Sequence, residues 1–348
     1  ITIMDNLSPQ IHGEGECLLL RKIKEKCTFI KGDVRNKEDW KKALKEQEVI
    51  VHLAAETGTA QSMYEAVKYN DVNIMGTAHM LELLTTTKHK VKKMLIASSR
   101  AIYGEGKYLC SIHGVTYPSQ RNESDMQKGE FNLKCDVCNS ELQLVATDER
   151  SKIHPSSIYG ITKQQQEQMV MLMGDSLDIA SVALRFQNVY GPGQSLLNPY
   201  TGILSIFSTR ILNGNDLDIY EDGFESRDFV YIDDVVDATI LAIEKEEANG
   251  QVFNVGSGVA TTVKEVAECL SNHYNSDAHI LISSNYRLGD IRHNYADLTK
   301  IKDILGFSPR YDFQEGIHEF VKWVKKQGLM EDKYYISVKE LKDRGLMK

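Results

Sequence analysis

The sequence lacks any apolar run long enough to cross a bilayer, and it lacks an excess of basic residues. Its 348 residues include 41 Lys and Arg against 49 Asp and Glu, a net charge of −8 at pH 7. A membrane span needs about 20 consecutive apolar residues, and a nucleic-acid partner calls for a basic face. No secretory signal is visible either. We therefore expect a cytoplasmic protein that has neither a membrane nor a nucleic acid as its partner.

Cysteines are few, six in all, and their number does not suggest a disulfide scaffold. Three of them fall in a short polar segment that reads Cys110-Ser-Ile-His113 and then Cys135-Asp-Val-Cys138. Three thiolates and one imidazole at this spacing suit tetrahedral zinc, with no position left open for catalysis. We expect a structural zinc that stabilises a segment too polar to form its own core. The alternative is free cysteines and a surface histidine.

Short apolar runs alternate with helical patterns in the first half of the chain. The runs are residues 1–4, 27–30, 49–53, 94–97 and 179–186, with helices expected at 37–47, 72–88 and after Pro155. Since the runs lack a clean polar alternation, we expect strands buried on both faces of a parallel sheet. This order predicts an α/β fold with a Rossmann-type doubly wound parallel sheet.

The same pattern suggests two parts. Residues 1–190 are expected to form the Rossmann domain, interrupted by a zinc-knuckle-like insertion at about 107–147. Residues 191–348 are mainly a smaller lobe, interleaved with returns to the main sheet. The charged tail, about 330–348, is expected to lie on the surface.

Polar and small residues follow the first strands at the carboxyl edge, where ligands of open α/β sheets bind. Asp5 is placed to hold the ribose hydroxyls of an adenosine and would repel a 2′-phosphate, which favours NAD over NADP; the alternative is a turn-forming Asp-Asn pair. His52 is interpreted as a packed strand residue. The predicted cofactor-binding residues at strand ends and on the following helix are Asp5, Asn6, Asp33, Val34, Leu53, Ala54, Ala55 and Asn73.

Tyr159-Gly-Ile-Thr-Lys163 places a phenol and an ammonium on one face of a helix. The lysine charge is expected to lower the pKa of Tyr159 toward a working range. Such a phenol can take a proton from a sugar hydroxyl. Ser99, just after a buried strand, can hydrogen-bond the same oxygen; the alternative is a turn serine.

These segments together resemble an extended short-chain dehydrogenase/reductase of the nucleotide-sugar epimerase and dehydratase family. The segments that carry the resemblance are residues 51–55, 73–77, 98–104, 159–163, 184–194, 226–235 and 289–293. The resemblance implies that Ser99 is the catalytic serine, that Tyr159 is the general base, and that Lys163 is its partner. It also implies that Tyr159 and Lys163 belong to the cofactor site, where Lys163 holds the nicotinamide ribose of NAD.

The resemblance further implies a nucleotide-diphosphate sugar as the substrate. Its expected ligands are Ser99, Arg100, Asn188, Arg227 and Arg292, the last three of which match diphosphate or nucleotide ligands of the family. Guanidinium forks suit phosphate oxygens. The alternative for Arg227 and Arg292 is a pair of surface ion pairs with the adjacent Asp228 and Asp290.

The chain departs from the family pattern in two places. The family's 4,6-dehydratases have an acidic pair after the catalytic hydroxyl, and Arg100 and Ala101 stand there instead, so we reject dehydration. The family's Gly-rich phosphate loop is absent as well. We expect that about thirty residues, the size of a βα unit, have been cropped before Ile1. A genuine truncation would leave a damaged enzyme.

Within the family, the insertion together with residues 5–13 and 61–64 is similar to the dTDP-L-rhamnose 4-epimerase branch. The expected function is NAD-dependent epimerisation at C4 of dTDP-L-rhamnose or a related dTDP-6-deoxyhexose, through a 4-keto intermediate, by a homodimer. One alternative is a 4-ketoreductase or decarboxylase of the same fold. Another is a non-catalytic binding or scaffold relative, if the truncation is real.

Overall fold

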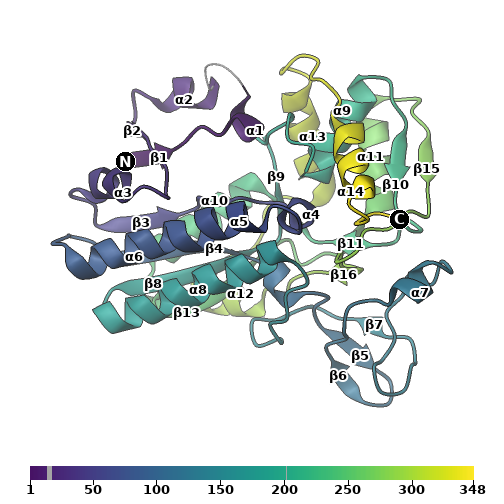
Figure 1. The fold of residues 1–348 in the computed structure, drawn as a ribbon, viewed down its shortest axis with the longest axis horizontal. Coiled ribbons are helices and arrows are strands. Elements are labelled where there is room, and N and C mark those ends of the chain that lie inside the picture. The colour runs from purple at the N-terminus through teal and green to yellow at the C-terminus, as the bar shows by residue number, and fades with distance from the viewer. Residues whose placement is uncertain (14–17, 201) are drawn as a thin grey trace.

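The computed structural model describes residues 1–13, 18–200 and 202–348. Its main sheet is parallel and has the strand order β13-β8-β4-β3. These strands are β3 (Val49–His52), β4 (Lys93–Ser99), β8 (Ala180–Phe186) and β13 (Gln251–Val255). The predicted parallel α/β sheet is confirmed (Figure 1).

Helices cover both faces of this sheet (Figure 1). Met94 and Ile96 of β4 pack on one face with α6 (Gly76–Thr86) and α8 (Ile158–Leu177). Leu95, between them, packs on the other face with α10 (Ile232–Glu244) and α12 (Thr299–Leu305). Because successive side chains of a strand point to opposite faces, both faces of β4 must be apolar.

The expected burial on both faces holds for β4 and β8 and is wrong for β3 and for the first two strands, β1 (Thr2–Asp5) and β2 (Thr28–Lys31), in which no residue is fully buried. All seven residues of β4 are buried, and so are the five central residues of β8. In β3 burial alternates, with Ile50 and His52 buried while Val49 is 39% and Val51 36% exposed. The reason is position, because β3 is the edge strand of this sheet among the described residues.

A separate parallel pair, β1 (Thr2–Asp5) with β2 (Thr28–Lys31), lies beside β3, and no backbone pairing joins it to β3 among the described residues. It is attached through α3 (Lys37–Leu44), whose Trp40 Nε1 donates to the carbonyls of Val34 (2.8 Å) and Gly76 (3.1 Å). The Trp40 ring also meets His52 edge-on at 5.5 Å. One indole thus joins β2, α6 and β3.

A second apolar core forms the other lobe, with β9 (Asn188–Tyr190) and β12 (Phe229–Tyr231) between the two cores. It packs α9 (Ile203–Leu212), α11 (Val263–Tyr274) and α13 (Phe313–Val324) around the parallel pair β10 (Leu217–Ile219) and β15 (Ile280–Ile282). A short sheet runs β14 (Thr261–Thr262), β11 (Ser226–Arg227), β16 (His293–Asn294).

The surface tail expected at the C-terminus is wrong. Helix α14 (Tyr334–Asp343) buries Tyr334, Ser337 and Leu341, and Met347 pairs with Arg287 through a β-bridge. Apolar positions three and four apart on α14 explain its docking. No helix in the described parts of the chain is both long and apolar enough to cross a membrane.

Residues of the expected insertion form an antiparallel sheet, β6-β5-β7, at the lower right of Figure 1. Its strands are β5 (Tyr108–Cys110), β6 (Gly114–Thr116) and β7 (Gln143–Leu144), with α7 (Glu123–Met126) between them in sequence. The insertion docks by packing Met126 and Phe131 on Tyr286 and Leu288. The remaining short elements are α1 (Pro9–His12), α2 (Leu18–Ile23), α4 (Thr59–Ser62), α5 (Ala66–Tyr69), η1 (Asn70–Met75), η2 (Arg100–Tyr103) and η3 (Glu246–Ala248).

A buried ion pair ties α8 to the sheet. Arg185 of β8 donates from Nε (3.0 Å) and Nη2 (2.5 Å) to the two carboxylate oxygens of Glu167 on α8. Ser98 Oγ of β4 donates to the same carboxylate at 2.5 Å, and Arg185 Nη1 donates to the Tyr103 hydroxyl at 2.7 Å. The bidentate geometry of the Arg185–Glu167 pair and the additional hydrogen bonds compensate for the burial of the two charges.

Replacing Glu167 by Gln is expected to lower the free energy of unfolding by about 3–5 kcal/mol, because it leaves the Arg185 charge buried and unpaired. The two side chains are only 5% and 7% exposed. Glu46→Gln is the control, since the Lys90–Glu46 pair is 59% and 65% exposed and is expected to contribute less than about 1 kcal/mol. Urea unfolding followed by circular dichroism measures both. Equal losses in the two variants would contradict the expectation.

Candidate active site

The structure brings Ser99 and Tyr159 together at the carboxyl end of β4. Ser99 ends β4 and caps η2 by accepting from Ala101 N at 3.1 Å. Tyr159 lies in the first turn of α8, which Ser157 caps by accepting from Gly160 N at 3.1 Å. A Cβ at Gly160 would lie 2.6 Å from the Ala101 carbonyl oxygen, so only glycine lets α8 approach η2 this closely.

The Ser99 hydroxyl and the Arg100 guanidinium are the side chains that act on the Tyr159 phenol. Burial raises the pKa of Tyr159, while the Ser99 hydrogen bond and the Arg100 charge oppose that rise. The expectation that Lys163 lowers the pKa of Tyr159 is therefore wrong for this structure. The spacing places both residues on one helix, but it does not fix where the amine of a long side chain points.

The Lys163 amine is directed along its own helix. Its Nζ donates to Gln166 Oε1 at 2.8 Å, and the residue is 3% exposed. Burial lowers the pKa of Lys163 to about 7, with the charge of Glu167 opposing. A buried amine with a depressed pKa is one of the perturbed groups that mark functional sites.

Asn73 joins the end of β3 to α8. Its Oδ1 accepts from Glu56 N at 2.7 Å, and its Nδ2 donates to Glu56 O at 3.1 Å and to Thr162 Oγ1 at 2.9 Å. Asn73 is fully buried, so in this structure it holds protein segments together. His52 packs inside the core, as expected: its Nε2 lies 3.0 Å from Thr77 Oγ1, and burial lowers its pKa to about 3.

The predicted adenosine residues lie at the carboxyl ends of β1, β2 and β3. Asp5 Oδ1 accepts from Leu7 N at 2.7 Å, and 44% of the Asp5 side chain is exposed. Asn6 donates to Asp33 at 3.1 Å. Arg35 hydrogen-bonds Asp33 and holds the pKa of that carboxyl below its usual range. The Asp33 carboxylate is therefore already bound by a side chain of the protein.

This edge fits an adenosine in its chemistry. Asp5 offers an accessible carboxylate for a ribose diol, and Leu53, just past β3, is 58% exposed as an apolar surface. Ala54 and Ala55 follow it with small side chains, and Val34 is buried against α3. The residues that are present therefore fit NAD at its adenosine end.

Arg100 and Asn188 lie near Tyr159. Arg100 Nε donates to Asn188 Oδ1 at 3.0 Å. Burial lowers the pKa of Arg100 to about 10, and the positive charge of Arg227 acts in the same direction. The structure thus groups Ser99, Tyr159, Arg100 and Asn188 at one place.

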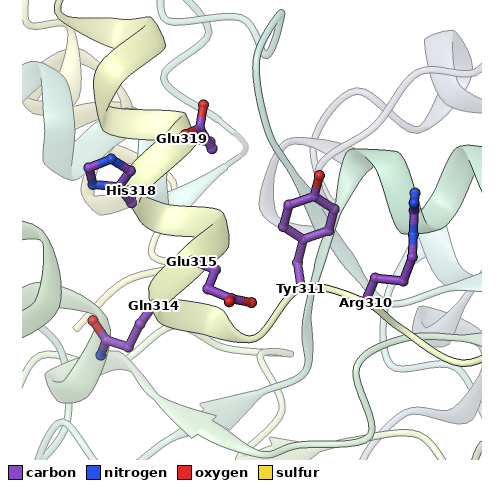
Figure 2. A pocket seen from close by; sticks show the side chains of 6 residues that line it. All are labelled: Arg310, Tyr311, Gln314, Glu315, His318 and Glu319. Atoms are coloured by element: carbon purple, nitrogen blue, oxygen red, sulfur yellow. The ribbon is translucent and has the colours of Figure 1, made fainter.

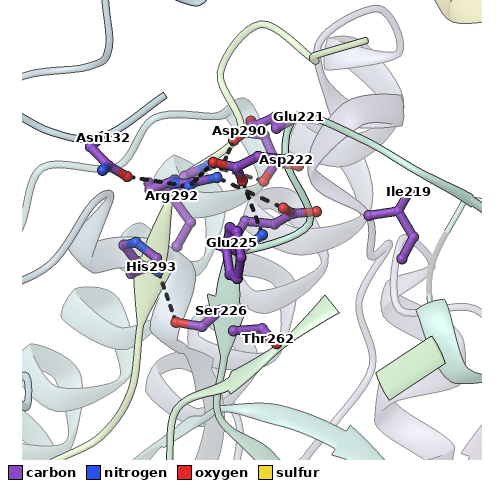
Figure 3. Close-up of polar contacts among 12 residues, drawn as sticks. Asn132, Ile219, Glu221, Asp222, Glu225, Ser226, Thr262, Asp290, Arg292 and His293 are labelled. Atoms are coloured by element: carbon purple, nitrogen blue, oxygen red, sulfur yellow. Dashed lines mark hydrogen bonds and ion pairs between the residues drawn. The ribbon is translucent and has the colours of Figure 1, made fainter. Parts of the chain in front are cut away.

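Arg227 and Arg292 are buried, not on the surface as the ion-pair alternative supposed. Arg227 Nη2 donates to Asp290 Oδ1 at 3.0 Å. Arg292 donates from Nη1 to Glu221 at 2.9 Å and from Nη2 to Asp222 at 2.7 Å (Figure 3). Asp228, which the alternative paired with Arg227, instead accepts from backbone N–H groups and a hydroxyl, those of Ser257, Gly258 and Ala296.

Arg227, Arg292 and their carboxylate partners form a charge cluster, several members of which were not predicted from the sequence. Burial alone would raise the pKa of Asp290, yet four arginines hold it below its usual range: Arg287, Arg227, Arg121 and Arg100. Burial raises the pKa of Glu105 to about 7. One feature of the sequence could have indicated Glu105, namely its position directly after Tyr103-Gly104. No such feature indicated Arg121, because it lies in the polar insertion far from the other members in sequence.

The four predicted metal ligands converge in the insertion. The ligand atoms of Cys110, His113, Cys135 and Cys138 all lie within 4.8 Å of one another. The Cys110–Cys138 sulfurs are 3.6 Å apart, and the Cys135 sulfur is 3.5 Å from His113 Nδ1. A disulfide needs about 2.05 Å, whereas sulfurs at about 2.3 Å from a tetrahedral zinc lie about 3.8 Å apart. The donor set and its spacing therefore fit zinc.

A separate surface hollow lies on α13, away from these residues in the fold. Its lining residues are Arg310, Tyr311, Gln314, Glu315, His318 and Glu319 (Figure 2). None of them belongs to the groups described above, so this hollow is not the candidate active site.

Two protein-family models match the chain. The model of the NAD dependent epimerase/dehydratase family matches residues 138–256, and that of GDP-mannose 4,6 dehydratase matches residues 12–118. The dTDP-L-rhamnose 4-epimerase of Burkholderia thailandensis is 35% identical over 327 residues, which cover 93% of this chain and 88% of the relative.

Solved structures of nucleotide-sugar 4-epimerases have a similar fold. The UDP-glucose 4-epimerase of Thermotoga maritima with UDP-glucose has a TM-score of 0.73 and 29% identity, covering 93% of this chain and 90% of that one. The UDP-N-acetylglucosamine 4-epimerase of Methanobrevibacter ruminantium with UDP-N-acetylmuramic acid has a TM-score of 0.72 and 30% identity, covering 94% and 91%. The chain belongs to the NAD-dependent epimerase/dehydratase family of enzymes, within the extended short-chain dehydrogenases/reductases.

Proposed function

We propose that the protein epimerises C4 of a nucleotide sugar, with dTDP-L-rhamnose or a related dTDP-6-deoxyhexose as the substrate. The observation that carries the proposal is the placement of Ser99, at the end of β4, beside Tyr159 in the first turn of α8, with Arg100 next to both. The 35% identity to a dTDP-L-rhamnose 4-epimerase supports the choice of sugar. Arg100 and Ala101 follow Ser99 where a dehydratase has acids, which favours epimerisation over loss of water.

The proposal divides the work between two parts of the chain. Residues 1–190 hold NAD, through Asp5 and the carboxyl ends of β1–β3 and through Tyr159 and Lys163. Residues 191–348 mainly hold the nucleotide diphosphate, through Arg227 and Arg292 with Asn188 near the boundary. When it is bound, NAD supplies the hydride acceptor and donor for C4.

The residues of the chain manage the proton and the substrate oxygen. Tyr159 takes the proton of the C4 hydroxyl as the sugar becomes its 4-keto form, and it returns that proton when the hydroxyl is restored. Ser99 donates a hydrogen bond to the same oxygen, where negative charge develops. The Ser99 hydrogen bond and the Arg100 charge already oppose the rise in the pKa of Tyr159 that burial produces.

Tyr159→Phe is expected to lower kcat by about 10²–10⁴-fold, because it removes the proton acceptor while keeping the ring. Product analysis of dTDP-L-rhamnose incubated with the NAD-loaded protein measures the C4 epimer, and wild-type protein should form it without net NADH. Ser99→Ala should reduce kcat less. Tyr335→Phe, a change on an exposed tyrosine of α14, is the control.

Unchanged turnover in Tyr159→Phe would refute the proposed base. Stoichiometric use of reduced cofactor would indicate a 4-ketoreductase, and release of carbon dioxide from a uronic-acid nucleotide would indicate a decarboxylase.

We also propose that Cys110, His113, Cys135 and Cys138 hold one structural zinc ion. The support is their convergence and the short S–S and S–N distances. The insertion has a small apolar cluster, with Met126 and Phe131 from its own chain segment. A segment with so little core gains its order from a metal.

Elemental analysis is expected to find about one zinc per chain, by the four-ligand rule for structural sites. Cys135→Ser should lose that metal, because it removes one of four ligands. Cys27→Ser is the matched control, since Cys27 lies outside the cluster, between α2 and β2. Equal zinc contents in the two variants would exclude the site.

We further propose a homodimer in the cytoplasm, in which helices carrying Asn73 and Tyr159 pair across the interface. Exposed apolar side chains on η1 and on these neighbouring helices support the interface: Val67 (85%), Met75 (47%), Ile161 (38%) and Leu172 (66%). Exposed apolar side chains gathered on neighbouring helices are a feature of interaction sites.

Leu172→Lys is expected to weaken the dimer by about tenfold or more, because it places a charge in an apolar contact. Light scattering after size exclusion measures the molar mass across a dilution series. Leu329→Lys is the control, because Leu329 is similarly exposed, at 69%, but follows α13 in the other lobe. A monomeric wild type, or equal behaviour of the two variants, would contradict the proposed interface.

A further inference from the structure

The loop between the two ligand pairs of the insertion reaches the arginines expected to bind diphosphate. Residues 114–134 connect His113 to Cys135, and they include Arg121, Phe131 and Asn132. Asn132 Oδ1 accepts from Arg292 Nη2 at 3.2 Å, and the Arg292 guanidinium lies 5.9 Å from the centre of the Phe131 ring. Figure 3 shows Asn132 pointing at Arg292. The insertion therefore contacts the charge cluster directly.

Arg121 shares a carboxylate oxygen with Arg292. Arg121 Nη1 donates to Glu221 Oε2 at 2.7 Å, and Arg292 Nη1 donates to the same oxygen at 2.9 Å. Both side chains are almost fully buried, 4% and 1% exposed. Two buried guanidiniums on one oxygen are held apart by their like charges and together by the carboxylate. The position of Arg292 therefore depends on Arg121.

Arg121 also meets the segment that holds Arg227. Its Nη2 donates to the Asp290 carbonyl at 3.0 Å, while Arg227 Nη2 donates to the Asp290 carboxylate at 3.0 Å. Its Nε lies 3.6 Å from Glu105, whose carboxylate accepts from Arg292 N at 2.7 Å. One side chain of the insertion thus links Glu221, Asp290 and Glu105, which surround both arginines.

The charge cluster contains hydrogen-bond donors that have no acceptor. The buried Nε groups of Arg121, Arg287 and Arg292 have no hydrogen-bond partner among the described residues. A buried donor without an acceptor is unfavourable by about 1–3 kcal/mol or more when it is charged. Burial raises the pKa values of both Glu105 and Glu225 to about 7, which reduces the negative charge inside the cluster near neutral pH. An added anion with several oxygens suits this environment.

We propose that Arg121 is a positioning residue for the substrate's diphosphate, and that metal binding by the Cys/His cluster tightens nucleotide-diphosphate binding by holding the loop that carries Arg121. This inference rests on the proposed nucleotide-sugar function, and it adds a regulator to that same site. Cys110, His113, Cys135 and Cys138 close the loop from both ends, so their metal removes most of its freedom.

The coupling must be reciprocal. If metal binding increases the affinity for the diphosphate, the diphosphate increases the affinity for the metal by the same factor. The loop is the element that both ligands order, through the cluster at one end and through Arg121 and Asn132 at the other.

The experiment measures the affinity of the full-length, NAD-loaded protein for dTDP, with UDP in parallel, by titration calorimetry. Removal of zinc by a chelator is expected to weaken dTDP binding by about 5- to 150-fold, the usual range of coupling between sites. In return, saturating dTDP should slow the release of zinc to a colorimetric chelator, whereas thymidine without phosphates should not.

Arg121→Ala is expected to weaken dTDP binding and to raise KM by about tenfold or more while kcat stays within about twofold, because the change removes binding that is common to ground and transition states. Arg121→Lys should recover only part of the affinity for dTDP. It restores the positive charge, but one ammonium cannot bond both Glu221 and Asp290. Lys128→Ala is the matched control: it removes one positive charge from the same insertion, where Lys128 is 66% exposed.

The outcomes separate this inference from the proposed function. One result overturns the inference alone. In it the wild type epimerises the sugar, but its affinity for dTDP is the same with and without zinc, and Arg121→Ala and Arg121→Lys bind dTDP as tightly as the wild type does. Arg121→Lys and zinc removal still decide the matter if Arg121→Ala does not fold. A loaded wild type that binds neither dTDP nor UDP overturns the proposed function and the inference with it.

Discussion

The buried pair of Arg185 and Glu167 is the interaction on which the candidate catalytic geometry depends. It fixes α8 against β8, and through Ser98 it also reaches β4, the strand that ends in Ser99. Tyr159 lies two helical turns before Glu167 on the same helix. Because the pair and the Gly160 contact locate α8 at two points, they place the phenol beside the Ser99 hydroxyl at the end of β4.

Much of this arrangement could be predicted from local patterns. Local sequence of a few residues predicts the strand ends, the pairing of Tyr159 with Lys163 and the spacing of the Cys/His pairs. It does so because helix and strand periodicity fix which positions share a face. The direction of the Lys163 amine was not readable, since it depends on Gln166 and on burial. Arg121 and Glu105 were missed because other segments of the chain supply their partners. These partners are Glu221 and Asp290 for Arg121, and Arg121 and Arg292 for Glu105. The burial of β3 was overestimated because periodicity does not reveal which strand forms an edge.

The arginines expected to bind diphosphate are already engaged by carboxylates of the chain. Arg227 holds Asp290, and Arg292 holds Glu221 and Asp222. On our proposal, a diphosphate bound at this place exchanges acceptors at these guanidiniums and also meets Nε groups that have no partner among the described residues. Such an exchange favours anions that offer several oxygens at once, because each guanidinium gives up a charged partner only for a comparable one.

The insertion is the part of the fold least able to order itself. Its apolar cluster is small, and two of the four residues, Tyr286 and Leu288, come from the main body. Its order must then come from the Cys/His cluster and from docking against the segment that carries Arg287 and Asp290. That segment belongs to the charge cluster as well, so the same contacts that order the insertion also shape the proposed diphosphate site. On our proposal, a polar insertion placed here is for that reason coupled to the substrate, whereas the same insertion on the far face of the sheet would only add surface.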